Sequence, residues 1–215
     1  MGRTITVRGQ ASVSARPDLI IIESQLCAQA ADYDVTIKTA SAQHAALIAS
    51  LSQVEFSKEE IKTTNFSVDT EYDNVSDERG NYKRIFKGYR CEHASRIEFA
   101  LSLQRLSLTI AALSVCRAKP QFSIMFTVKE PDNLKELALV QAADTARHRA
   151  EVLCVASGVS LGALLSINCE FKDLTILSPT MFTMRNVAAA NTEVPELNPQ
   201  DVSVSDSASF TFEIA

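Results

Sequence analysis

Period-two alternation of apolar and polar residues recurs along most of this chain of 215 residues and constrains its fold more than any other feature. Over residues 4–15, Ile5, Val7 and Val13 occupy alternate positions, with Thr, Arg, Gln and Ser between them. Successive side chains of a strand point to opposite faces, so this spacing predicts a half-buried strand. The same pattern predicts further strands over 19–30, 61–72, 84–102, 121–128, 161–171 and 202–214.

Three segments between the expected strands show helical spacing instead. They cover 33–54, 104–117 and 132–157, and the last is rich in alanine. Asp34 is the expected N-cap of the first helix, and Gly158 suits the C′ position of the third. In the first segment the residues at helical spacing are Ile37, Ala40, His44, Leu47, Leu51 and Val54.

These segments predict an α+β fold with a mostly antiparallel sheet of about seven strands and three helices packed on one face. The expected element order is β-β-α-β-β-α-β-α-β-β. Antiparallel sheets can have one solvent-exposed face, and the helices are expected to cover the other, apolar face. No linker divides residues 1–172, so 1–215 is expected to form a single domain. Two closely packed subdomains that share a sheet are the alternative.

Composition narrows the possible partners. An apolar fraction of 46% supports a hydrophobic core, and 21 basic against 26 acidic residues give a net charge of −5. A nucleic-acid-binding protein usually carries a basic stripe, and this chain has no basic run, so nucleic acid is not an expected partner. No window of 18 apolar residues occurs, so no membrane span is expected.

Five cysteines bear on the expected compartment. Their number is odd and no CxxC spacing occurs, which favours a reducing environment over a disulfide framework. Residues 1–6 lack the apolar region of a signal peptide. A cytoplasmic protein is therefore expected from the chain as given, and a periplasmic or secreted one if a signal peptide was removed.

The sequence predicts no catalytic, cofactor-binding or metal-ligating residues. His44 lies on the apolar helix stripe without a second histidine four positions away, so a packed or boundary role is expected. Cys91 and His93 lie two apart on one strand and point in parallel, which disfavours a nucleophile–base pair. His148 lies between two arginines and could belong to an anion patch. A solvated helical face is favoured, because Arg147 and Glu151 form an i,i+4 pair.

Two segments are candidates for contacts between subunits. Residues 173–200 form an irregular arm or loop with exposed methionine and phenylalanine, which could fold back over the core or dock on a neighbouring subunit. The hairpin around 72–90 is expected to project beyond the sheet. Its basic residues (Lys83, Arg84, Lys87, Arg90) and acidic residues (Asp73, Asp77, Glu78) could pair between subunits, although a solvated hairpin is favoured.

Six short sequence patterns follow one another along the chain in an order that resembles a known protein family. They are Ile5-Thr6-Val7-Arg8-Gly9, Pro17-Asp18, Ile61-Lys62-Thr63, Gly88-Tyr89, the alanines of the third helix with Gly158 and Leu161-Gly162, and the final Val202 to Ile214 strand. In this order, over roughly 4–171 and 201–214, the chain resembles the SIMPL-domain family.

The resemblance implies a fold more than an activity. Family members are mostly bacterial envelope or secreted proteins of poorly defined role; some are linked to oxidative stress and some form ring-like oligomers. A eukaryotic relative is an adaptor that binds a kinase, and no catalytic residues are established for the family. The first hypothesis is a non-enzymatic oligomeric scaffold or envelope/stress-associated factor. The alternatives are a peptide- or small-ligand-binding module and an enzyme or thiol redox protein that uses Cys91 or another cysteine.

Overall fold

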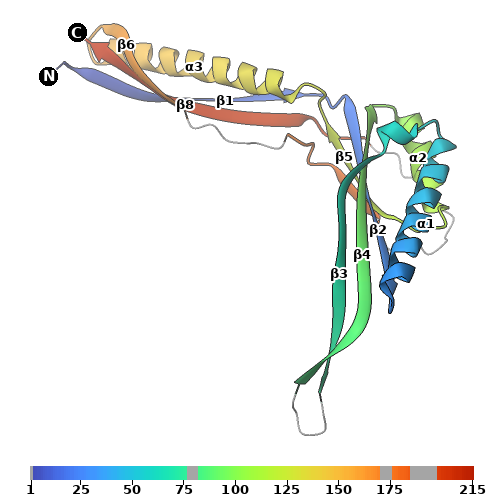
Figure 1. Ribbon diagram of the computed structural model, residues 1–215. Helices are drawn as coiled ribbons and strands as arrows, with labels where there is room; N and C mark the ends of the chain where they lie inside the picture. Colours follow the sequence, from blue (N-terminus) through green and yellow to red (C-terminus); the bar gives the residue numbers. More distant parts are fainter. Residues whose placement is uncertain (1, 77–81, 170–175, 185–197) are drawn as a thin grey trace. The chain divides into compact units, whose positions relative to one another are not determined.

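The computed structural model describes residues 2–76, 82–169, 176–184 and 198–215 (Figure 1). It contains three α-helices and two sheets, of three and five strands. The chain divides into two compact units. One, the terminal unit, contains Met1–Asp18, Phe126–Thr180 and Pro199–Ala215; the other, the central unit, contains Leu19–Met125 and Met181–Asn198.

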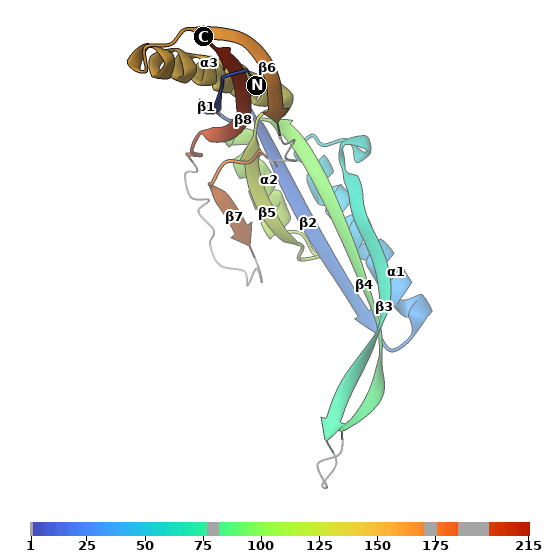
Figure 2. The same cartoon turned by 90° about the vertical axis from the view of Figure 1, so that its left-hand side faces the viewer.

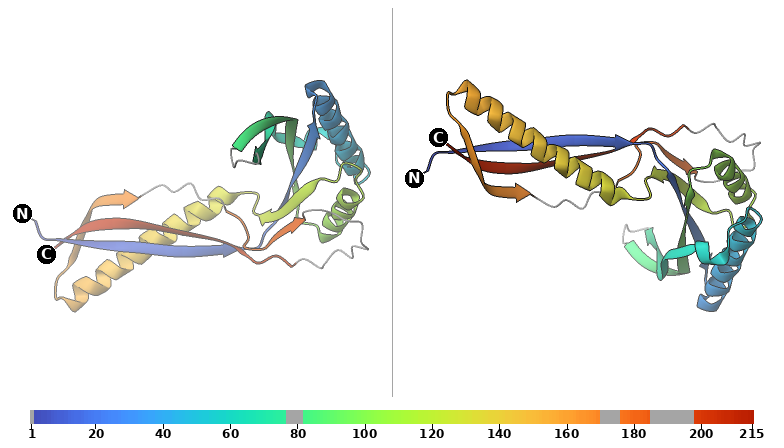
Figure 3. Two further views of the ribbon diagram at one scale, coloured as in Figure 1. Left: turned by 90° about the horizontal axis from the view of Figure 1, so that it is seen from below. Right: turned by 90° about the horizontal axis from the view of Figure 1, so that it is seen from above.

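The terminal unit is a three-stranded sheet covered on one face by a long helix. Its strands are β1 (Thr4–Ala15), β6 (Leu161–Cys169) and β8 (Val202–Ile214), in the order β1-β8-β6. β8 pairs antiparallel with both neighbours. The helix α3 (Pro131–Ala156) crosses β1 and β8 obliquely (Figure 3).

Small residues let α3 lie close to this sheet. Ala138, Ala142, Ala146 and Ala150 recur every four positions and are all 0% exposed. Opposite them, Gly9 is buried, and a Cβ built on it would overlap the Ala142 carbonyl oxygen. The apolar face of the sheet is completed by larger side chains, which include Val7, Val13, Val202, Val204, Phe210 and Phe212.

The central unit is a five-stranded sheet with two helices. Its strands are β2 (Leu19–Ala30), β3 (Lys62–Ser76), β4 (Tyr82–Ala100), β5 (Gln121–Thr127) and β7 (Met181–Met184), in the order β3-β4-β2-β5-β7 (Figure 2). α1 (Tyr33–Ser52) packs on β2 and β4, beside α2 (Leu103–Ser114), and the 3-10 turn η1 (Lys58–Glu60) follows α1. The core of this unit contains Ile20, Ile22, Leu47, Leu51, Leu106 and Ile110, each at most 2% exposed.

The hairpin of β3 and β4 extends beyond β2 within the central unit (Figure 2). A register shift between Glu71 and Tyr72 marks the start of the projecting part. Gly88 has φ of +146°, and a Cβ there would overlap the Ala30 carbonyl, so a glycine is required where β4 passes the end of β2. The strands run to Ser76 and from Tyr82, further into the tip than the sequence predicted.

The α+β class, the three helices and the antiparallel pairing are confirmed, with three differences in detail. The strands form two sheets rather than one, and an eighth strand, β7, lies within the segment 173–200 that was expected to be irregular. Ile176 of that segment is buried in the core of the terminal unit, while residues 173–175 and 185–197 lie outside the described residues. The N-cap of α1 is Asp32 rather than Asp34.

Local geometry explains the helix ends. Asp32 has extended backbone angles, and its carboxylate accepts a hydrogen bond from the Val35 N–H at 3.1 Å, whereas Asp34 already lies in the first turn. Gly158 has φ of +70° directly after α3, as predicted for a C′ glycine. Among the described residues, no helix is both long enough and apolar enough to cross a lipid bilayer.

Candidate functional site

Two histidines from distant parts of the sequence stack on each other in the central unit. His44 of α1 and His93 of β4 have ring centroids 4.1 Å apart, and Phe66 meets His93 edge-to-face. The Thr63 hydroxyl lies 3.0 Å from His93 Nε2, within hydrogen-bond distance. The packed role predicted for His44 agrees with this position, but its stacking partner was not predicted.

Burial favours the neutral form of both imidazoles. It lowers the pKa of His44 below its ordinary 6.5, and the Lys58 ammonium of η1 lowers it further. The pKa of His93 is lowered by burial first and by His44 second. No group of three or more potential metal-ligating side chains occurs in the part of the chain that the structure describes. We therefore interpret this histidine pair (His44 and His93) as a packing contact between α1 and the sheet.

Cys91 occupies an apolar site. It is 1% exposed and packs with Ala28 and Ala40. Burial raises the pKa of its thiol, and Cys27 and Glu92 add to that effect. A nucleophilic cysteine needs the opposite shift together with solvent access, so the geometry around Cys91 and His93 favours a structural role for both.

The open face of the five-stranded sheet carries a network of ion pairs. Arg96 lies 2.7 Å from Glu98 and 3.6 Å from Glu23, and Arg90 lies 2.7 Å from Glu92. A hollow of about 610 Å³ lies beside this network and is lined by polar side chains such as Gln25, Ser123 and Thr183 and by Met181 and Met184. These carboxylates already have arginine partners, and exposed ion pairs of this kind are typical of a solvated sheet face.

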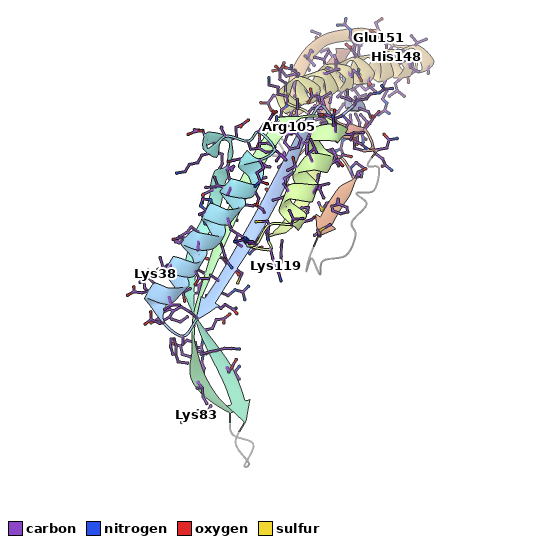
Figure 4. The ribbon with its side chains drawn as sticks, turned by 90° about the vertical axis from the view of Figure 1, so that its right-hand side faces the viewer. Lys38, Lys83, Arg105, Lys119, His148 and Glu151 are labelled. Carbon is purple, nitrogen blue, oxygen red and sulfur yellow. The ribbon has the colours of Figure 1, made fainter. Side chains whose placement is uncertain are left out.

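Two contacts within the projecting hairpin involve its charged side chains. Lys87 contacts Asp73 at 3.2 Å, and the Arg84 guanidinium stacks over the Tyr72 ring at 4.1 Å. Lys83 lies near the end of the described part of this hairpin (Figure 4). The Lys87–Asp73 ion pair and the Arg84–Tyr72 contact both lie within one chain, and whether the hairpin is solvated stays a prediction. Asp77 and Glu78 lie outside the described residues.

A groove in the terminal unit lies between α3 and the edge of β1 that faces away from β8, and we name it the β1–α3 groove. Its volume is about 640 Å³. The Arg149 guanidinium donates a hydrogen bond to the Arg8 carbonyl at 2.9 Å. Arg147, two positions away, pairs with Glu151 at 3.3 Å, as predicted. The groove is lined by Thr6, Val7, Arg8, His148, Arg149, Val152 and Leu153.

His148 therefore lines a groove, a position that sequence reasoning did not assign to it. Figure 4 places His148 and Glu151 on α3. The apolar partners Val152 and Leu153 were also not identified, because the alternation of β1 does not reveal which helix lies beside its edge. The only available signal was the basic triplet Arg147-His148-Arg149, which was interpreted as a solvated face.

β6 presents a second unusual surface in the terminal unit. It forms one end of the sheet order, and among the described residues it pairs only with β8. Leu164 and Ile167 lie opposite Phe212 and Phe210, which places them on the helix side, yet they are 47% and 57% exposed. Register shifts on both sides of Leu164 interrupt the first half of the strand. The prediction that the helices cover the apolar face does not hold here.

The fold and these surfaces define a two-unit α+β protein whose described residues present edges and grooves. The chain belongs to the SIMPL family, described as a protein of unknown function (DUF541), whose family model matches residues 5–212. This confirms the family predicted from the ordered patterns.

Three relatives that match this chain are named as uncharacterized proteins. The chain is 26% identical over 166 residues to the uncharacterized protein YggE of Escherichia coli K12. The match covers 77% of this chain and 65% of that protein. The uncharacterized proteins YggE of Escherichia coli O157:H7 and of Shigella flexneri match to the same extent.

Proposed function

We propose that this SIMPL-family protein is a non-catalytic scaffold that self-associates through β6. The observation that carries the proposal is the composition of this edge strand. None of the nine residues Leu161–Cys169 is charged and none is proline. Natural edge strands are usually protected by charges, prolines, bulges or a covering element, and within the described part of the chain β6 has only the bulges beside Leu164.

A second copy of this chain is the partner that best fits β6. A two-fold axis would place the same uncharged strand opposite itself in antiparallel register, without opposing like charges. The main chain would continue the sheet hydrogen bonding from one copy to the next. Leu164 and Ile167 would become buried, which removes an exposed apolar surface that a monomer rarely keeps without a function.

The surroundings of Cys91 and of the histidine pair support a non-catalytic role for these three residues. The Cys91 thiol is buried with a raised pKa, and the histidine pair is held by stacking. A functional cysteine or histidine is usually accessible and has its pKa tuned toward the working pH. The association with the cell envelope and with oxidative stress stays a prediction of the family resemblance.

Solution mass tests the scaffold proposal. Size-exclusion chromatography with light scattering is expected to give a multiple of 23.5 kDa for the protein. Ile167→Lys places a charge in the edge strand and is expected to return the mass to 23.5 kDa. Val155→Lys is the matched control, because Val155 is an exposed apolar residue on α3, 80% exposed. It should leave the mass unchanged.

Two results would contradict this proposal. One is a mass of 23.5 kDa for the unmodified protein at high concentration. The other is an oligomer that Ile167→Lys leaves intact and Lys87→Glu dissociates, which would move the interface from β6 to the projecting hairpin. Circular dichroism of each variant would confirm that it is folded.

A further inference from the structure

The β1–α3 groove contains main-chain groups of an edge strand that pair with no other strand among the described residues. β1 is at one end of the sheet order, and the residues that the structure describes place no strand on its outer side. The Thr6 side chain bonds Thr211 at 3.0 Å, and the Arg8 guanidinium bonds Ser207 at 2.7 Å, on the sheet face away from α3. Thr6 and Arg8 therefore line the groove through their main chain.

The direction of the main-chain groups follows from one hydrogen bond. The Arg8 carbonyl points to the free edge, because it accepts a hydrogen bond from Arg149 Nη1 at 2.9 Å. In an antiparallel strand, the N–H and C=O of one residue point to the same side, and the side alternates along the strand. Thr6, two positions earlier, consequently also directs its N–H and C=O into the groove, where an added strand could bind them.

The helix side of the groove supplies apolar contacts and positive charge. Val152 and Leu153 are 53% and 49% exposed, although they lie beside the buried Val7. The ionisable side chains on the helix side of the groove are His148 and Arg149, both basic, whereas the Arg8 guanidinium bonds Ser207 on the opposite face of the sheet. In a chain of net charge −5, this local excess of basic groups selects for a ligand that carries carboxylates.

We propose that the β1–α3 groove binds an extended acidic peptide, which adds to the sheet as a strand beside β1. Edge strands bordered by a groove bind peptides in this way: main-chain hydrogen bonds hold the peptide and pockets select alternate side chains. Apolar side chains on the helix side contact Val152 and Leu153. The peptide N–H takes the place of Arg149 at the Arg8 carbonyl, and the released guanidinium pairs with a peptide carboxylate.

Arg149 has two roles in this arrangement. In the free protein it satisfies a main-chain acceptor of the edge and limits pairing with strands that lack a carboxylate. In the complex it forms a charge-assisted contact, which is stronger than a neutral hydrogen bond. The groove therefore selects by charge as well as by strand shape.

Fluorescence anisotropy with defined peptides tests the proposal. The probe is a fluorescein-labelled octapeptide of alternating valine and threonine in which two of the threonines are replaced by aspartate. A second peptide has lysine at those two positions, and a third has proline at the central valine, which removes a main-chain N–H. The aspartate peptide is expected to bind at least about tenfold more tightly than either, a preference typical of a charge-assisted contact.

The chain offers matched controls for both parts of the groove. Arg149→Ala is expected to weaken binding of the aspartate peptide by about tenfold or more, while Arg147→Ala leaves it unchanged, since Arg147 pairs with Glu151. Val152→Glu should weaken binding, and Val155→Glu should not, because Val155 does not line the groove. Amide chemical shifts of Thr6 and Arg8 should move on titration.

Several outcomes would overturn the proposal. In the anisotropy assay these are equal affinities for the aspartate and lysine peptides, or no binding to the unmodified protein at millimolar peptide. Equal effects of Arg149→Ala and Arg147→Ala, or amide chemical-shift changes confined to residues outside the groove, would also do so. A further one is an oligomer that Val152→Glu dissociates without any peptide binding, which would make the groove an interface between copies. Failure of assembly through β6 leaves these readouts unaffected, because they use the isolated peptide.

Discussion

Gly9→Ala tests how closely α3 approaches β1. The added Cβ would overlap the Ala142 carbonyl oxygen and lie 2.8 Å from the Ala146 Cβ and 2.9 Å from the Ala142 carbonyl carbon. Two of these atoms belong to the backbone of α3, so no side-chain rotation relieves the contact. Inserting one methyl into such a site typically costs about 1–3 kcal/mol.

The sign of the change in stability on Gly9→Ala separates close packing of α3 on β1 from loose packing. Gly9 does not have a positive φ, so alanine fits its backbone conformation. Where space permits, Gly→Ala stabilises a protein by about 0.4–1 kcal/mol, because the unfolded chain loses conformational freedom. Close packing therefore predicts a loss of stability, and loose packing predicts a gain.

Thermal unfolding followed by circular dichroism measures the effect. For a chain of this length, 1 kcal/mol corresponds to about 2–4 °C, so Gly9→Ala is expected to lower the melting temperature by roughly 2–12 °C. Gly2→Ala is the control, since its Cβ would meet only Glu213 Oε1, at 3.9 Å. In a double-mutant cycle with Ala146→Gly, the two losses should be less than additive, because the second change removes the side-chain contact and leaves the backbone overlap. A melting temperature of Gly9→Ala equal to or above that of the unmodified protein would refute the reasoning.

Two further predictions concern the central unit. Burial lowers the folded-state pKa of both members of the histidine pair, so the unfolded chain binds more protons than the folded protein just below pH 6.5. The contribution of the neutral pair to stability is therefore complete above about pH 6.5 and is lost as the pH falls through the folded-state pKa values. Urea unfolding should show that the free energy of unfolding falls less between pH 7.5 and pH 5.5 in His44→Gln than in the unmodified protein. An equal fall in both would contradict the histidine pair as the cause. Asp32→Ala removes the N-cap of α1 and should cost about 0.5–2 kcal/mol in the same assay. A larger cost for Asp34→Ala would restore the N-cap position that the sequence suggested.

The two edges of the three-stranded sheet differ in how they meet solvent. At β1, Arg149 covers a main-chain carbonyl and brings positive charge to the edge. β6 has no charged residue, and its Leu164 and Ile167 side chains are exposed. The first edge suits a ligand that can displace an arginine, and the second suits an uncharged strand such as its own copy. This difference is the reason for assigning separate partners to the two edges.

Local pattern was sufficient for the three helices and for every strand except β7. The alternation of Ile5, Val7 and Val13 identified β1, and the spacing of Ala40, Leu47 and Leu51 identified the buried side of α1. These predictions hold because side-chain periodicity is set by backbone geometry within a few residues. The family followed from the same order of elements, together with short patterns that recur at fixed places in it.

Features that depend on long-range pairing were decided only by the tertiary structure. His44 and His93 meet because α1 packs over β4, and the β1–α3 groove forms because a strand near the N-terminus lies beside a helix that begins at Pro131. The division of the strands into two sheets likewise depends on which strands become neighbours. β6 shows the reverse case: its alternation predicted a covered apolar face, but coverage depends on the path of α3, which lies over β1 and β8. Periodicity determines which face of an element is apolar, whereas packing between distant segments determines what covers that face.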